Sequence, residues 1–137
     1  MAKFDKYILK QTKATAKGSA ATGPVFDKGP IKDWGGIAHR FVWTHVTAPT
    51  AIETEAHSHD FEEYLCFCSA DPATPFDFGA EVELSMGSEG EKQVIANSTI
   101  VCVPKGLVHG PIKFTKVSKP VLFTHIFAAK DHVKKGK

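Results

Sequence analysis

Hydrophobic and polar residues alternate in several short segments of the chain, and Gly or Pro residues separate these segments. Side chains of a β-strand point to opposite faces in turn, so this alternation predicts short strands. No long segment has the hydrophobic spacing of an amphipathic helix. The expected strands cover residues 37–46, 61–68, 81–86, 92–95, 99–103 and 121–127.

Several short strands in one small chain are typical of a β-sandwich or barrel, so we predict an all-β fold. The segment Met86–Glu91 contains two glycines and predicts a hairpin loop between two of the strands. Residues 1–30 are expected to form an extended, partly ordered N-terminal lead-in, because much of this segment is small, polar and interrupted by Gly. The barrel is expected over residues 31–130, followed by a Lys-rich tail at 131–137.

A length of 137 residues suits a single domain, and the uneven distribution of charge narrows the function. Residues 33–115 contain four Lys or Arg but twelve Asp or Glu, whereas the flanks are strongly basic. A basic surface on the folded centre is therefore not expected, which argues against nucleic-acid binding. No apolar run reaches 18 residues, so no transmembrane helix is expected.

The first ten residues lack the apolar core of a signal peptide, and the chain has an odd number of cysteines, three. We therefore expect a cytoplasmic protein with free thiols. Cys66 and Cys68 share a strand face with Tyr64, opposite Glu63. We expect this row to be covered in a homodimer, and we expect Cys102 to be a small buried residue.

Histidines provide the strongest chemical signal. Side chains two positions apart in a strand share a face, so His57, His59 and Glu63 point the same way as Leu65 and Phe67. If Leu65 and Phe67 face the core, two imidazoles and a carboxylate also point inward, which is costly unless they are paired. A divalent transition metal would satisfy these groups. The alternative is a hydrogen-bonded polar cluster without a metal.

A fourth metal ligand must come from another part of the chain. Pro104 and Gly106 predict a tight turn that delivers the following residues at a fixed angle. His109 lies directly after this turn and is the natural supplier of the fourth ligand.

These spacings resemble the two sequence motifs of the cupin superfamily. The first motif lies at His57, His59 and Glu63, and the second lies in the segment 104–109. The resemblance covers residues 37–127. It implies a double-stranded β-helix, which is a small jelly-roll barrel, holding one divalent metal (Fe, Mn, Zn or Ni) on three His and one Glu.

The resemblance also implies a metal-dependent enzyme that acts on a small molecule. Oxygenation, isomerisation, decarboxylation and lyase chemistry all occur among cupins, and the sequence does not choose between them. A non-enzymatic module that binds or senses a small ligand is the alternative. A purely structural metal site, with all coordination positions filled by the protein, is a third possibility.

A second titratable group beside the metal would favour an enzyme over a binding module. The sequence offers three candidates for this role, His45, His125 and Glu81. Glu81 also fits an outward, solvated strand face. An apolar wall suited to a small organic substrate is expected from Trp43, Phe61 and Phe67.

Overall fold

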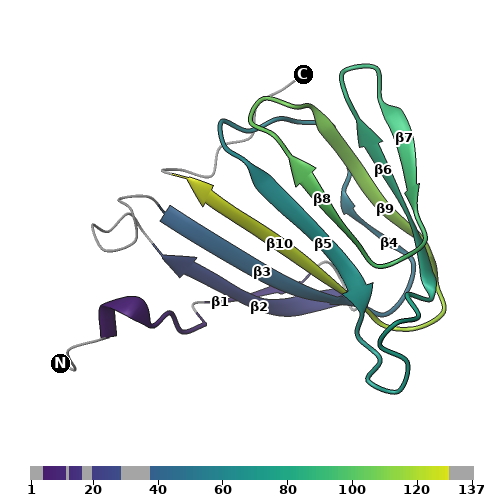
Figure 1. The fold of residues 1–137 in the computed structure, drawn as a ribbon, viewed down its shortest axis with the longest axis horizontal. Helices are drawn as coiled ribbons and strands as arrows, with labels where there is room; N and C mark the ends of the chain where they lie inside the picture. The colour runs from purple at the N-terminus through teal and green to yellow at the C-terminus, as the bar shows by residue number, and fades with distance from the viewer. Residues whose placement is uncertain (1–4, 12, 17–19, 29–37, 130–137) are drawn as a thin grey trace.

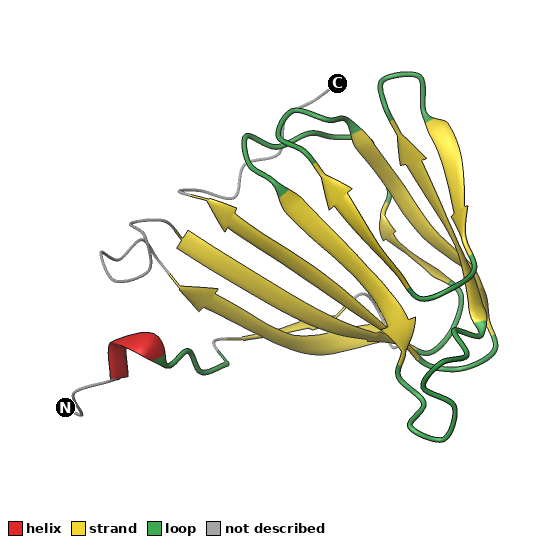
Figure 2. Cartoon of the chain, in the orientation of Figure 1, coloured by secondary structure: helices red, strands yellow, loops and turns green. Residues whose placement is uncertain are grey.

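The computed structural model describes residues 5–11, 13–16, 20–28 and 38–129. These residues form two antiparallel β-sheets and one short 3-10 helix, η1 (Asp5–Tyr7), as Figures 1 and 2 show. Sheet A has the order β1 (Lys13–Ala16), β2 (Ala21–Lys28), β3 (Ala38–Val46), β10 (Val121–Ala129), β5 (Glu63–Ser69) and β8 (Thr99–Val103). Sheet B has the order β4 (Thr50–Glu53), β9 (His109–Val117), β6 (Ala80–Met86) and β7 (Glu91–Ile95).

The predicted all-β fold is confirmed, and all six expected strands are present with small changes at their ends. The predicted hairpin loop at Met86–Glu91 joins β6 to β7. Among the described residues, no helix is long and apolar enough to span a bilayer.

Three strands that complete the two sheets, β2, β4 and β9, were not expected from the sequence. β2 pairs with β3, so sheet A includes residues that we assigned to the N-terminal lead-in. β4 is a short edge strand of sheet B, and β9 follows the turn that carries the second motif. β9 matters most for function because it begins at His109.

The core lies between the inner faces of the two sheets. Leu65, Phe67 and Phe123 point inward from sheet A, and Leu84 and Phe114 point inward from sheet B. The ring of Phe67 lies 4.9 Å from that of Phe123 and 6.0 Å from that of Phe114. These contacts join the sheets, because the three rings come from β5, β10 and β9.

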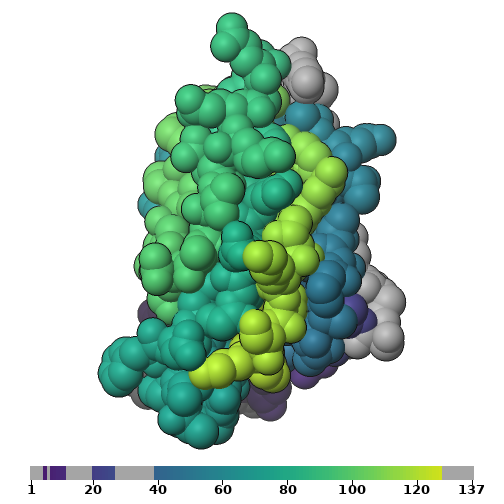
Figure 3. Space-filling model, turned by 90° about the vertical axis from the view of Figure 1, so that its right-hand side faces the viewer, coloured from purple at the N-terminus to yellow at the C-terminus, as the bar shows by residue number. Residues whose placement is uncertain are grey.

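The sheets approach each other at one end of the barrel and spread apart at the other, which we call the wide end (Figure 1). At the narrow end, the loop of residues 70–79 lies against the turn between β9 and β10. Figure 3 shows this end, with the teal loop beside the yellow-green turn. The amide of Ala70 donates to the carbonyl of Pro120, and the amine of Lys119 contacts Asp77. The narrow end is thus held by direct contacts.

The outer face of sheet A corrects one expectation. The three cysteines are free thiols, as expected, but Cys102 is exposed and not buried. Cys102 pairs across the sheet with Tyr64, whereas the inward positions of β8 are Val101 and Val103. Both faces of β8 carry apolar residues, so the hydrophobic pattern did not distinguish them.

We predict that Phe67→Ala lowers the free energy of unfolding by about 3–5 kcal/mol, because it leaves a cavity among three packed rings. Denaturant unfolding followed by circular dichroism would measure this loss. Val94→Ala is the control, since Val94 is 60% exposed, and it should change stability by less than about 0.5 kcal/mol. Equal effects of the two substitutions would contradict the assigned core.

Candidate metal centre

Four polar side chains are buried together at the wide end of the barrel. His57 and His59 lie just before β5, Glu63 is the first residue of β5, and His109 is the first residue of β9. Their exposed fractions are 6%, 2%, 1% and 1% in that order. Because β5 and β9 belong to different sheets, the cluster forms only when both sheets are in place.

Backbone hydrogen bonds join the two halves of the cluster. The amide of His57 donates to the carbonyl of His109, and the amide of His109 donates to the carbonyl of His57, both at 2.9 Å. Gly110 is required beside this pair, because a Cβ there would lie 2.7 Å from the carbonyl oxygen of Glu55 and its φ is +96°. The pairing holds the two imidazoles with their ring centroids 4.5 Å apart.

An irregularity in the pairing of β9 with β6 turns His109 toward the interior. Leu84 pairs with Ile112 and Met86 pairs with His109, so a step of two residues on β6 spans three on β9. The additional residue shifts the alternation of side chains, as in a β-bulge. His109 and Ile112 are consequently both buried although they lie three positions apart.

Backbone carbonyls determine which nitrogen of two imidazoles is available to a metal. The Nδ1 atom of His57 lies 3.1 Å from the carbonyl oxygen of Glu55, and that of His109 lies 3.0 Å from the carbonyl oxygen of Leu107. A carbonyl only accepts, so each Nδ1–H is the donor. In the neutral ring, Nε2 then has the lone pair that binds a metal ion.

The donor atoms of the three histidines are close enough for a single ion. One ring nitrogen from each of His57, His59 and His109 lies within 4.8 Å of the other two. Donors on opposite sides of a zinc ion lie about 4 Å apart, because each bond is about 2.0–2.1 Å long, so a small closure of the triad would bring all three nitrogens onto one ion. The buried Nε2 atom of His109 has no hydrogen-bond partner, which leaves it suited to a metal. The residues therefore fit a divalent ion.

The carboxylate of Glu63 lies against this histidine triad. Its Oε1 atom is 2.9 Å from Nε2 of His109, so the carboxylate oxygen and the imidazole nitrogen meet at one point of the interior. Burial alone would raise the pKa of Glu63, but the imidazoles of His109 and His125 outweigh this effect and hold that pKa well below its usual range. The carboxylate is therefore ionised, as a metal ligand must be.

The pKa of His109 is shifted by the same contact. Burial would lower it, but the carboxylate of Glu63 and the carbonyl of Leu107 outweigh burial and raise the pKa of His109. The carboxylate therefore favours a positive charge beside His109, which a proton or a bound cation can supply.

Solved structures share this arrangement of sheets, although no protein-family model and no curated protein sequence matches the chain. A protein with a double-stranded β-helix domain from Klebsiella pneumoniae is 14% identical, with a TM-score of 0.56 over 100% of this chain and 97% of the other. KdgF from Halomonas sp. is 11% identical, with a TM-score of 0.52 over 84% of each chain. The chain has the cupin fold. The double-stranded β-helix implied by the motifs is confirmed.

Fe(II) HppE also has this fold, with 10% identity, a TM-score of 0.53 and coverage of 88% of this chain. The chain spans 59% of the length of HppE. TM-scores of 0.52–0.56 show the shared fold, whereas identities of 10–14% leave any reaction to be inferred from the site.

Within the cupin barrel, one of the three candidate catalytic residues lies at the cluster. His125, on β10, contacts Oε2 of Glu63 through its Nε2 atom. Phe61, a candidate for the substrate wall, stacks on His59 with ring centroids 4.6 Å apart. Phe127, which we did not expect at this wall, stacks on Phe61 with ring centroids 4.8 Å apart and extends the wall away from the cluster.

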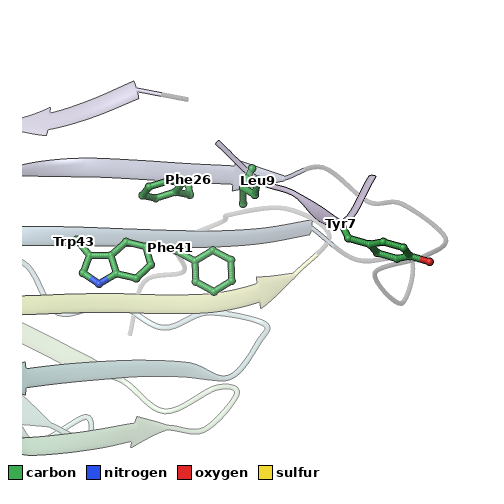
Figure 4. Close-up of a pocket in the computed structure, with 5 residues that line it drawn as sticks. All are labelled: Tyr7, Leu9, Phe26, Phe41 and Trp43. Atoms are coloured by element: carbon green, nitrogen blue, oxygen red, sulfur yellow. The ribbon is translucent and has the colours of Figure 1, made fainter. Parts of the chain in front are cut away.

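Trp43 does not line the interior, and this expectation was wrong. Val42 and Thr44 are the buried inward residues of β3, so Trp43 lies on the outer face of sheet A. There it borders a shallow pocket of about 320 Å³ with four other apolar side chains, which Figure 4 shows: Tyr7, Leu9, Phe26 and Phe41. His45 shares the outer face and is exposed, so it also lies away from the cluster.

Two further candidates lie away from the cluster for different reasons. Glu81 points outward from β6, where its carboxylate lies 2.9 Å from the amine of Lys116. Its neighbours Ala80 and Val82 are the inward residues, so the solvated alternative describes Glu81. Phe67 is 1% exposed and packs in the core, so it supports the barrel instead of forming a substrate wall.

Proposed function

We propose that this protein is a metalloenzyme that acts on a small molecule. In this proposal, His57, His59, Glu63 and His109 hold one divalent transition metal at the wide end of the barrel. The observation that carries the proposal is the burial of three imidazoles and an ionised carboxylate in one cluster. Such a group is costly to bury unless a bound ion or a complete set of hydrogen bonds compensates it.

The surroundings of the cluster favour an enzyme over a purely structural metal site. His125 supplies a further titratable side chain beside the proposed ligands, and it is partly exposed. Phe61 and Phe127 supply an apolar wall against which a small organic molecule can pack. A non-enzymatic binding module is the alternative, and it would need the same apolar wall.

The ligand set indicates the kind of chemistry. Imidazole and carboxylate ligands suit Fe, Mn, Zn and Ni, and a bound ion would supply Lewis-acid chemistry, or oxygen chemistry if it is iron. The Fe(II) of HppE makes iron the first metal to test. The protein residues orient the donors, because the carbonyls of Glu55 and Leu107 set the tautomers of two imidazoles.

Metal content is the first measurement, made on untagged protein purified without chelators. We expect about one equivalent of metal in the wild type and less than about a tenth in His59→Ala, because His59 is a proposed ligand. Glu62→Ala is the matched control, since Glu62 is next to Glu63 but exposed, and it should retain the metal.

If neither the wild-type protein nor the control takes up Fe, Mn, Zn or Ni on reconstitution, the cluster is a polar core and the proposal fails. Loss of metal in Glu62→Ala but not in Glu63→Ala would show that Glu62, and not Glu63, points toward the metal.

An open coordination position separates an enzyme from a structural site. Protein loaded with Co(II) should change its visible absorption spectrum when azide is added, because azide enters a position that the four side chains leave open. A spectrum unchanged up to millimolar azide would indicate a shell closed by the protein and would favour the structural role.

We also propose that the protein is a cytoplasmic homodimer. Tyr64 is 43% exposed, and it lies beside exposed Cys102 and Ile100 on the outer face of β5 and β8. β8 is the edge strand of sheet A. An apolar edge of this kind is normally covered, and a second copy of the chain would cover it.

Ile100→Lys should convert the dimer to a monomer, because it places a charge at the centre of this apolar edge. Sedimentation velocity would measure the change in mass. Val94→Lys is the control on the outer face of sheet B, where Val94 is also exposed, and it should remain dimeric. A monomeric wild-type protein would contradict the proposed assembly.

A further inference from the structure

The two oxygens of the Glu63 carboxylate have different neighbours. Oε1 lies 2.9 Å from Nε2 of His109, one member of the histidine triad. Oε2 contacts Nε2 of His125 and lies 3.6 Å from Nε2 of His59. The carboxylate is almost fully buried, so these side chains, and not water, determine its orientation.

The strand pairing explains how His125 reaches this position. β10 lies between β3 and β5, and Phe127 pairs with Glu63 while His125 pairs with Leu65. His125 is therefore diagonal to Glu63 on the inner face of sheet A. Its ring lies 5.2 Å from that of Phe127 and 6.5 Å from that of Phe123. These flanking rings limit the rotation of the imidazole and keep it directed at the carboxylate.

His125 is not itself a member of the group of metal donors. The group of described residues whose donor atoms lie within 4.8 Å of one another consists of His57, His59 and His109, and Glu63 reaches this group through Oε1, 2.9 Å from Nε2 of His109. The Nε2 atom of His125 faces a carboxylate oxygen instead. Its effect on a metal would therefore pass through Glu63.

We propose that His125 is a positioning residue for Glu63, an inference that rests on the proposed metal centre. The Nε2–H group of His125 donates to Oε2 and keeps that oxygen engaged, so that Glu63 offers only Oε1 to the ion. A carboxylate that binds through both oxygens occupies two coordination positions, whereas one that is held in this way occupies one. His125 thus preserves a position for a small-molecule substrate.

The test compares two variants of His125 in protein loaded with Co(II). His125→Phe fills the same aromatic surroundings without a donor, and His125→Gln keeps an N–H donor at a similar distance from the backbone. We expect His125→Phe to weaken Co(II) binding by about 10–100-fold and to shift the visible absorption bands. His125→Gln should restore affinity to within about threefold of the wild type and restore the bands.

Thr124→Val is the matched control, because Thr124 is the neighbouring residue of β10 and points to the opposite face of the sheet. It should leave Co(II) affinity and the spectrum unchanged. Thermal unfolding of each variant before metal is added would show whether a change in affinity reflects loss of the fold. If His125→Phe does not fold, His125→Met and His125→Gln form an equivalent pair, since they match in length and differ in the donor.

The outcomes distinguish this inference from the proposed function. If the wild type does not bind Co(II), both fail. If the wild type binds Co(II), His59→Ala does not, and His125→Phe binds with unchanged affinity and spectrum, only the role of His125 is overturned. If His125→Gln binds as weakly as His125→Phe, the donor has no role and the inference is also overturned.

Discussion

The burial of three imidazoles and one carboxylate between two sheets is the constraint on which the rest of the site depends. Polar groups of this kind lose their hydration on burial, so the protein must orient each one toward a partner. The backbone pair between His57 and His109, the bulge in β9 and the glycine at position 110 all serve this purpose. Because the four side chains come from both sheets, binding of a metal to them would stabilise the packing of the barrel as a whole.

The histidine and glutamate positions could be predicted from the sequence because the relevant pattern is local. Leu65 and Phe67 are buried and alternate with less buried residues, so they establish the inward face of β5, and Glu63 follows by parity. The same parity extended to His57 and His59, although these two residues precede the regular strand. His109 followed from the turn before it, without knowledge of the strand that it begins.

Other features depend on contacts that are distant in the sequence. β3 and β8 have apolar residues on both faces, so the facing of Trp43 and Cys102 is decided by which side the second sheet covers. β2 contains small and polar residues, and its pairing with β3 makes it a strand. His125 lies 62 residues from Glu63 in the sequence. Its contact arises because β10 lies beside β5, which no local pattern indicates.

The barrel separates its stability from its chemistry. Phe67, Phe114 and Phe123 join the sheets in the core, whereas the polar cluster occupies the wide end. Residues at the wide end can therefore change the ligand set or the substrate wall while the aromatic core preserves the fold. This separation explains how chains of 10–14% identity can share the architecture, and why any function of the cluster would depend on the few side chains around it and not on the barrel itself.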